Sequence, residues 1–566
     1  MASARRHLGQ QARLFPPVRN AVPIEERGAV FTKRWVVELI LDLAGFFADR
    51  DLVSCRTIEP AAGEGAFLVP MAERLIASCR RQGRPDLACM NSVLAFELDS
   101  RTAHAARSAL YSTLLAMNVI PGDASLLAQS WIRVGDFLFE APSLHEVDFI
   151  IGNPPYVRIE DLPNDVQSFY RSSYPTMKGR ADLYVAFFEA GLRLLRPDGV
   201  CAFICADRWM LNQYGSALRD LVSSRYSLET VVQMHEADGF LSDVSAYPAI
   251  TVIRRSRQRA VVVARANRDA EGAGASLLAH SLRQVADGAA VTLPSGLAAA
   301  RSETWYSGSE PWPLVEPRDV EILRRLESQF EAIGSEATST RVGIGVASGC
   351  DEVFLTTNPA LVEPSRLLPL ALADDLRTGT LQWSGHYLVN PWDRDGLVNL
   401  KDHPLLARYL ESHFEKLSSR HCAREQGKHW YRTIDRVDAT LTGRSKLYLP
   451  DIKGTIHPVL DRGTTYPHHN IYYVVSDVWD LEVLGGLMMS RIAQFFVECY
   501  AVRMRGGTLR FQAQYLRRIR VPRPDQVSVE HATRLRRAFA MRDVDSATEV
   551  AASIYGAPEF LSGRRS

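Results

Sequence analysis

An Asn-Pro-Pro-Tyr turn is the segment of this chain whose residue types could do chemistry. It follows segment 148–152, whose apolar residues Phe149, Ile150 and Ile151 are typical of a buried strand. Proline offers no N–H to a sheet ladder and drives the preceding residue out of the helical region, so the strand must end in a stiff, extended turn. The Asn153 side-chain oxygen and the Pro154 carbonyl can each accept a hydrogen bond from an amino group. We therefore expect a planar substrate with an exocyclic amine to be bound and stacked by Asn153, Pro154, Pro155 and Tyr156. The alternative is an ordinary proline-rich turn in which Tyr156 packs for stability.

A glycine-rich turn lies upstream, in segment 55–68, which is typical of a short strand, a turn and the start of a helix. Small residues let the backbone approach a ligand closely, and the helix that follows offers free N–H groups. Many glycine turns bind nothing, so the prediction depends on the segments that follow. The residues of this turn that we expect at a cofactor site are Glu59, Ala61, Gly63 and Gly65.

Two further predicted strands end in acidic residues. Segment 92–99 presents Glu97, whose carboxylate could accept hydrogen bonds from both ribose hydroxyls of an adenosyl cofactor. Segment 132–138 presents Asp136 for an adenine amine and Phe137 for the face of the adenine ring. Ligand chemistry in open α/β sheets lies at the carboxyl ends of the strands, which is where these residues are expected.

The order of these motifs resembles that of the gamma-class, TaqI-like N6-adenine DNA methyltransferases of restriction–modification systems. The resemblance implies an α/β fold: a Rossmann-like domain that uses S-adenosyl-L-methionine (SAM), followed by an α+β target-recognition domain. It also implies that an adenine is flipped out of double-stranded DNA and methylated at N6. Helix 182–195, closed by Pro197-Asp198-Gly199, and strand 200–206 match the elements that follow the catalytic turn in this family.

Two more residues take expected roles from the resemblance alone. Thr32 ends a first motif before the predicted helix 35–46 and would help hold the methionine carboxylate, although Lys33 stands where the family usually has proline. Phe240, before strand 249–253, would supply a second aromatic ring beside the flipped base. Tyr247 is a competing candidate, and core packing is an equal alternative for either ring.

Length and composition suggest more than one domain. The chain has 566 residues, 46% of them apolar and 23% charged, as in soluble globular proteins. We expect a catalytic domain over 1–256, a connecting segment over 257–310 that is rich in Ala, Gly and Ser, and a target-recognition domain over 311–566. Short strands at 261–264 and 290–293 are an alternative within the connecting segment.

Nucleic-acid binding requires a local basic patch, because the net charge is only +1. Arginines cluster between 503 and 523, interleaved with aromatic residues and glycines, and we expect Arg503, Arg505 and Arg510 to contact DNA. A solvated charged face that pairs with carboxylates is the alternative.

The remaining expectations concern partners and location. The eight cysteines show no Cys-x-x-Cys pair, so we expect neither zinc nor disulfides, and a reducing cytoplasm. No apolar run is long enough to span a membrane. We expect a monomer that acts on double-stranded DNA, with a separate restriction endonuclease as a further candidate partner. Competing functions are an N5-glutamine protein methyltransferase, a ribosomal RNA adenine methyltransferase, and a DNA-binding scaffold with an inactive cofactor pocket.

Overall fold

The computed structural model describes residues 32–240, 247–303, 305–313, 315, 317–424, 427–501 and 509–561. The chain divides into two compact units, Met1–Val320 and Glu321–Ser566. In the described parts of the chain, no helix is both long and apolar enough to cross a lipid bilayer.

The N-terminal unit is built on a nine-stranded sheet with the order β3-β2-β1-β4-β5-β7-β6-β8-β9. Strands β1 to β5 run parallel, and β7 runs antiparallel to both of its neighbours. This mixed but mostly parallel sheet confirms the predicted α/β fold. The strands are β1 Thr57–Glu59, β2 Val93–Glu97, β3 Ile132–Val134, β4 Val147–Gly152, β5 Leu195–Ala206, β6 Ser227–Glu236, β7 Pro248–Arg254, β8 Val261–Asn267 and β9 Leu297–Ser302.

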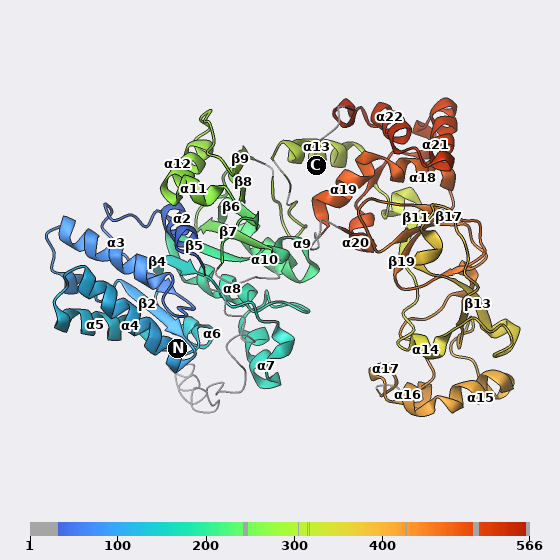
Figure 1. The fold of residues 1–566 in the computed structure, drawn as a ribbon, viewed down its shortest axis with the longest axis horizontal. Helices are drawn as coiled ribbons and strands as arrows, with labels where there is room; N and C mark the ends of the chain where they lie inside the picture. Colours follow the sequence, from blue (N-terminus) through green and yellow to red (C-terminus); the bar gives the residue numbers. More distant parts are fainter. Residues whose placement is uncertain are drawn as a thin grey trace. The chain divides into compact units, whose positions relative to one another are not determined.

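Helices flank this sheet, with α3, α4 and α5 grouped beside β2 (Figure 1). The helices are α2 Arg34–Ala44, α3 Leu68–Arg81, α4 Ser100–Ala116, α5 Pro121–Trp131, α6 Phe137–Glu140, α7 Asn164–Ser173, α8 Tyr184–Leu194, α9 Arg208–Leu211, α10 Ser216–Arg225, α11 Ala270–Ala273 and α12 Ala275–Ala286. The next helix, α13 Pro317–Gln329, begins in this unit and continues into the C-terminal unit.

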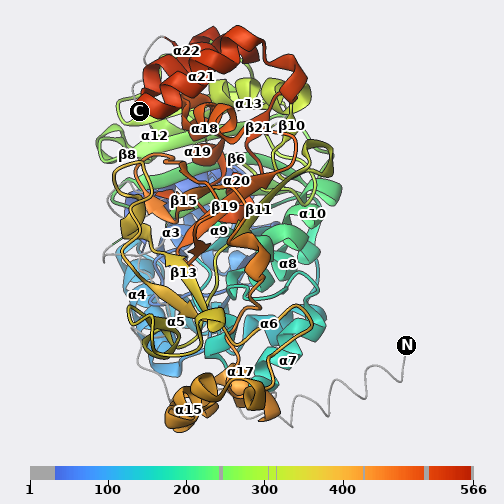
Figure 2. The same ribbon diagram turned by 90° about the vertical axis from the view of Figure 1, so that its right-hand side faces the viewer.

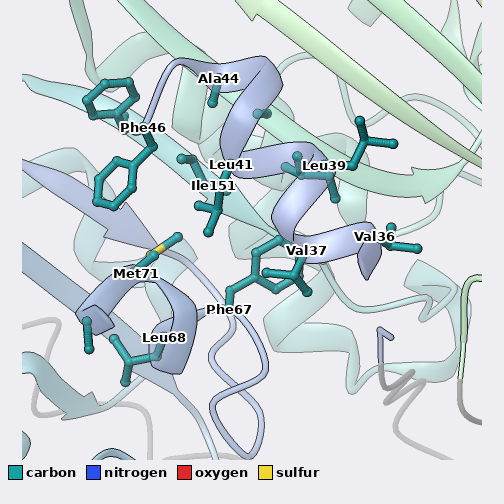
Figure 3. Close-up of a cluster of buried hydrophobic side chains, with 14 of the residues drawn as sticks. Val36, Val37, Leu39, Leu41, Ala44, Phe46, Phe67, Leu68, Met71 and Ile151 are labelled. Atoms are coloured by element: carbon teal, nitrogen blue, oxygen red, sulfur yellow. The ribbon is translucent and has the colours of Figure 1, made fainter. Parts of the chain in front are cut away.

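The core under the predicted motifs is formed by α2, α3 and β4. Apolar residues of α2 recur on one face of the helix, which ends at Gly45 in the left-handed region, with φ +77°. Figure 3 shows Val37 and Leu41 of α2 gathered with Phe67, Met71 and Ile151. This packing fixes the strand that leads into the Asn-Pro-Pro-Tyr turn and the helix that follows the glycine turn.

Segment 257–310 does not form the connecting segment that its composition suggested. Val261–Asn267 is β8 and pairs in parallel with β6, while Leu297–Ser302 is β9. Strand 261–264 is therefore confirmed, whereas 290–293 is not a strand. The helix α12 between them buries Leu278 and Leu282 in the same core as α2. The spacing of the apolar residues in α12, rather than the alanine and serine content of the segment, is what accounts for this helix.

Strand β5 also begins earlier than predicted. The sequence Pro197-Asp198-Gly199 was expected to close a helix before the strand, but it lies inside β5, which starts at Leu195. Asp198 adopts φ +63°, and the pairing with β4 shifts register between Val147 and Phe149. The turn residues thus form an irregularity within the strand.

The C-terminal unit is α+β, as predicted. Its described strands form four small sheets, with the orders β10-β21, β11-β19-β15-β17, β12-β14-β13-β18 and β16-β20. Figure 2 shows α21 and α22 side by side at one end of this unit. The strands are β10 Glu331–Ala332, β11 Thr340–Ile344, β12 Leu355–Thr356, β13 Leu367–Ala371, β14 Tyr387–Val389, β15 Lys446–Pro450, β16 Ile452–Lys453, β17 Val459–Asp461, β18 Tyr466–Pro467, β19 Ile471–Ser476, β20 Leu509–Arg510 and β21 Arg520–Val521. The helices are α14 Asp351–Phe354, α15 Pro404–Ser412, α16 Phe414–Ser418, α17 His421–Arg424, α18 Leu481–Met489, α19 Arg491–Tyr500, α20 Ala513–Leu516, α21 Val529–Met541 and α22 Val544–Tyr555.

Candidate active site

A cavity of about 210 Å³ lies at the carboxyl ends of β1, β2, β3 and β4. It brings together most of the residues that the motifs predicted, although they come from separate segments of the chain. The predicted site residues that line it are Thr32, Glu59, Ala61, Gly63, Glu97, Asp136, Phe137, Asn153 and Pro155. Gly65, Pro154, Tyr156 and Phe240 are not part of the lining.

The glycine turn forms one wall of this cavity. Gly63 adopts φ +54° and Gly65 φ +96°, a region that residues with a Cβ atom rarely adopt, so both positions favour glycine. The Gly65 N–H closes the turn on the Ala62 carbonyl at 2.9 Å. Gly65 therefore shapes the turn, while Ala61 and Gly63 face the cavity.

Glu97 presents its carboxylate to the cavity from the end of β2. One oxygen accepts the Gly63 N–H at 2.9 Å and the other accepts the Asp99 N–H at 2.8 Å. Burial raises the pKa of this carboxyl, and these two hydrogen bonds oppose the shift. Each oxygen has lone-pair capacity left, so the pair could also accept from two adjacent hydroxyl groups.

Asp136 and Phe137 follow β3 and form the far end of the cavity. Asp136 caps α6, because its Oδ1 accepts the Leu138 N–H at 2.9 Å. The Phe137 ring is almost fully buried, with its centroid 5.6 Å from the rings of both Phe96 and Phe187. This end of the cavity offers an acceptor beside an apolar ring, which suits a flat base with an amino group.

Glu59 is a fully buried acid that lines the cavity from the end of β1. Among the described residues, neither of its carboxylate oxygens has a hydrogen-bond partner. Burial, and then the charge of Glu97, raise the pKa of this carboxyl well above its usual value. A cationic ligand group next to Glu59 would offset that unfavourable burial.

The Asn-Pro-Pro-Tyr turn starts directly at the cavity. Asn153 Nδ2 donates to Thr32 Oγ1 at 3.2 Å, so a residue far upstream helps orient the amide. Thr32 forms an isolated bridge with Phe240, and the Lys33 N–H donates to the Gly239 carbonyl at 2.9 Å. Phe240 is therefore next to Thr32 beside the turn, but it is also largely buried in the core. The competing Tyr247 packs its ring against His235, with centroids 4.7 Å apart.

Tyr156 has a half-buried ring and a buried hydroxyl that has no hydrogen-bond partner in the described part of the chain. Its ring meets Tyr184 edge-on, with centroids 6.2 Å apart. The Tyr184 and Tyr214 hydroxyls lie 2.7 Å apart, and Tyr214 donates to Asp182 at 3.0 Å. The chain leaving the turn is held by the Leu183 N–H, which donates to the Val157 carbonyl at 2.7 Å. Tyr184, held by these hydrogen bonds, thus packs against one edge of the Tyr156 ring.

Some cavity residues had no signal in the sequence motifs. Tyr170 comes from α7, and Leu183 and Phe187 come from the end of the loop that follows α7 and from α8. Their side chains reach the cavity only because the chain folds back after the turn. The predicted helix 182–195 contained Leu183 and Phe187, but spacing alone could not show which of its residues face a ligand.

The predicted DNA-contact arginines are only partly described. Arg503 and Arg505 lie outside the described residues, and for Arg510 only the backbone, which pairs with Ile452 in the β16–β20 sheet, is described. Other arginines of the cluster contact their own unit. Arg517 donates to the Val342 carbonyl at 2.9 Å, and Arg518 lies 4.7 Å from the centroid of the Tyr500 ring.

The C-terminal unit also holds a group of potential metal ligands at Asp351, His468 and His469, whose ligand atoms lie within 4.8 Å of one another. His468 Nε2 is 3.2 Å from Asp351 Oδ2, and its Nδ1 is 2.9 Å from Asn470 Oδ1. Hydrogen bonds within the protein thus account for the position of His468.

Comparison with known proteins places these features in a family. Residues 136–240 match the model of the Eco57I restriction-modification methylase family. The chain is 42% identical to Type II methyltransferase M.PaeR7I of Pseudomonas aeruginosa, over 94% of this chain and 92% of the relative. It is 41% identical to Type II methyltransferase M.XhoI of Xanthomonas vasicola, over 94% and 98%.

A solved structure supports the fold over nearly the whole chain. The Type IIL restriction-modification enzyme MmeI, solved in complex with DNA, has a TM-score of 0.58 at 13% identity. The similarity covers 94% of this chain and 74% of MmeI. At 13% identity, this similarity supports a shared fold and no conclusion about activity.

Proposed function

Because this chain belongs to the Type II methyltransferases of restriction–modification systems, and is thus a DNA methyltransferase, we propose that it transfers a methyl group from SAM to N6 of an adenine. The observation that carries this proposal is that Asn153 lines the same cavity as Glu59, Glu97 and Asp136. The group suited to hold an amine thus lies next to the groups suited to hold the methyl donor.

The residues of the cavity fit SAM group by group. Glu97 would accept from the ribose hydroxyls, Asp136 would accept from the adenine amine, and Phe137 would pack against the adenine face. Glu59, buried without a partner among the described residues, would face the methionine ammonium, and Thr32 would help hold the carboxylate. When bound, SAM supplies an electrophilic methyl group on its sulfonium.

The catalytic turn supplies hydrogen-bond acceptors and orientation. The lone pair of adenine N6 is delocalised into the ring, so the amine is a poor nucleophile. The Asn153 side-chain oxygen and the Pro154 carbonyl would accept hydrogen bonds from the two N–H groups of this amine. These hydrogen bonds would favour a lone pair that is localised on N6. Tyr156 would stack on the base and aim N6 at the cavity. Most of the rate enhancement would then come from positioning.

An adenine stacked inside duplex DNA cannot reach this cavity, so it must be flipped out of the helix. We propose that the C-terminal unit binds the double-stranded DNA and selects the target, and that a separate endonuclease is the restriction partner. The whole-length similarity to restriction–modification methyltransferases favours DNA over a release-factor glutamine or ribosomal RNA as the substrate. We further propose that the enzyme works as a monomer in the cytoplasm.

The direct test is to incubate duplex DNA with the purified protein and isotopically labelled SAM, and to identify the labelled nucleoside by mass spectrometry. We expect N6-methyladenine, and we expect Asn153→Ala to lower the rate by a factor of about one hundred or more. Label in cytosine would refute the adenine assignment. Label in protein or RNA but not in DNA would refute the substrate class.

Base flipping can be followed separately. A duplex with 2-aminopurine at the target adenine should brighten when the protein binds, because the extruded base leaves its stacked neighbours. Stacking on Tyr156 should quench part of this signal, so Tyr156→Ala should brighten it further. Unchanged fluorescence with both proteins, under conditions where the duplex is bound, would contradict flipping.

A further inference from the structure

Helix α7 connects the catalytic turn to the far end of the cavity. It follows the turn in sequence, and it packs against α6, the short helix that begins directly after Asp136 (Figure 1). The Phe169 ring stacks on Phe139, with centroids 4.1 Å apart and an interplanar angle of 16°. The Tyr174 hydroxyl donates to the Leu138 carbonyl at 2.5 Å. A helix without a recognisable sequence motif is thus anchored where the adenine end of the cofactor is expected.

Tyr170 is the α7 residue that enters the cavity. Its side chain is 4% exposed, it lines the cavity together with Asp136, and its hydroxyl donates a hydrogen bond to Asp136 Oδ2. The other carboxylate oxygen accepts the Leu138 N–H. Both Asp136 oxygens therefore accept hydrogen bonds from the protein, and the carboxylate has further lone-pair capacity for a group in the cavity.

We propose that Tyr170 is a specificity-determining residue that holds Asp136 as a hydrogen-bond acceptor, so that the cavity selects an adenosyl over an inosyl nucleoside. The inference rests on the proposed use of SAM. The two nucleosides differ at one position: adenine carries a 6-amino group that donates, and hypoxanthine carries a 6-oxo group that accepts. A carboxylate accepts from the amino group and has no proton to offer the oxo group.

The ionisation of Asp136 supports this assignment. Burial raises the pKa of the Asp136 carboxyl, and the hydrogen bond from Tyr170 is the largest influence that lowers it. Without the Tyr170 hydroxyl, the protonated acid would gain population, and a protonated acid can donate to a 6-oxo group. Removing the hydroxyl should therefore both weaken adenosyl binding and reduce the discrimination against inosyl.

The test compares the binding of S-adenosylhomocysteine and S-inosylhomocysteine to the full-length protein by titration calorimetry. The parent should prefer the adenosyl compound by about tenfold to hundredfold, the range of one charge-assisted hydrogen bond. Tyr170→Phe should lower adenosyl affinity by about threefold to tenfold and bring the ratio closer to one. The matched control is Tyr174→Phe, which deletes a hydroxyl bonded to the Leu138 carbonyl at the end of the same helix and should leave the ratio at the parent value.

A second variant, at Asp136, tests the same hydrogen bond without a substitution in α7. Asp136→Asn replaces the acceptor with a side chain that both donates and accepts, so the ratio should fall toward one, and adding Tyr170→Phe should change it little further. A parent-like ratio in Tyr170→Phe, or an equal loss of ratio in Tyr174→Phe, would overturn the inference while leaving the proposed cofactor intact. If the parent bound neither compound, the cofactor assignment itself would fall, and this inference with it.

Discussion

At the residue scale, Glu59 is the side chain whose position most needs a ligand. Its carboxyl is fully buried and has no hydrogen-bond partner among the described residues. An isolated buried carboxylate is unfavourable, and burial accordingly raises the pKa of Glu59 well above its usual value. A ligand ammonium beside it would favour the ionised form instead.

Proton release on binding follows from this difference. Binding a cationic group lowers the pKa of Glu59, so between the bound and the free pKa the complex holds fewer protons than the free protein. Affinity for S-adenosylhomocysteine should therefore rise with pH through this interval and level off above the free pKa. Calorimetry in two buffers of different ionisation enthalpy should detect the released proton.

Glu59→Gln is the control, because it keeps the shape of the side chain and removes its titration. The variant should bind more weakly at pH 7 and release fewer protons than the parent. Glu97 and Asp136 also have raised pKa values, so a remaining pH dependence in the variant would belong to them. Equal proton release by parent and variant would contradict the role of Glu59.

The sequence predicted much of the site at the residue scale because its motifs occur at the ends of strands. The acid of each motif follows an apolar run, and parallel strands bring such ends to one edge of a sheet. Tyr170 could not be found in this way. Its position depends on how the chain folds back after the Asn-Pro-Pro-Tyr turn, and no local sequence pattern in α7 predicts that path. The roles of the individual site residues stay predictions.

At the element scale, predictions based on the spacing of apolar residues were more reliable than predictions based on amino-acid composition. The predicted amphipathic helix 35–46 corresponds to α2, which covers Arg34–Ala44. Segment 257–310 was judged by its alanine, glycine and serine content, and it instead supplies β8, α12 and β9. Pro197-Asp198-Gly199 has the composition of a turn and lies inside β5 as an irregularity, because β5 pairs with β4 at Leu195 and again only from Val200.

A buried ion pair joins two strands of the C-terminal unit. Lys446 of β15 lies opposite Asp461 of β17, both side chains are fully buried, and Nζ is 2.8 Å from Oδ2. Nζ also donates to the carbonyls of Leu441 and Arg444. Lys446→Met should leave the Asp461 carboxylate buried without its cation and destabilise the C-terminal unit by about 3–5 kcal/mol. Calorimetric scanning of the full chain should show this as a lowered unfolding transition.

The matched control for this pair is Arg462→Met. Arg462 forms an ion pair with Glu482, but its side chain is 74% exposed. Solvent screens such a pair, so the variant should shift the transition little, by under about 1 kcal/mol. Equal effects of the two substitutions would show that burial of the Lys446–Asp461 pair adds nothing to stability.

At the scale of the whole molecule, we assign the chemistry to the N-terminal unit and the choice of target to the C-terminal unit. Every residue that lines the 210 Å³ cavity lies before Val320. With a net charge of only +1, affinity for DNA must come from local groups of cations. The arginine-rich segment near the C-terminal end remains the predicted source.

Neutralising Arg503, Arg505 and Arg510 together, each to Gln, should weaken DNA binding. It should also flatten the dependence of log affinity on log salt, by about one unit for each DNA phosphate that the protein no longer neutralises. Fluorescence anisotropy of a labelled duplex across a salt series measures both quantities. Affinity for S-adenosylhomocysteine should stay at the parent value, since the three arginines belong to the other unit.

A triple variant with the same charge change controls for net charge. Arg462, Arg491 and Arg536 each form an ion pair with a carboxylate of the C-terminal unit. Their replacement by Gln should change the salt slope less, because their charge is already offset locally. The predicted contact surface is wrong if the two triple variants bind DNA alike.

We propose that the Asn153 turn positions an adenine for methylation at N6 within one DNA sequence. The most direct test of this proposal is to express the parent and Asn153→Ala in a host without DNA methylation and to read modified bases across the genome. We expect N6-methyladenine at one recurring sequence with the parent, and none with a variant that still binds S-adenosylhomocysteine. Modified cytosine, or adenine methylation that persists in Asn153→Ala, would contradict the claim.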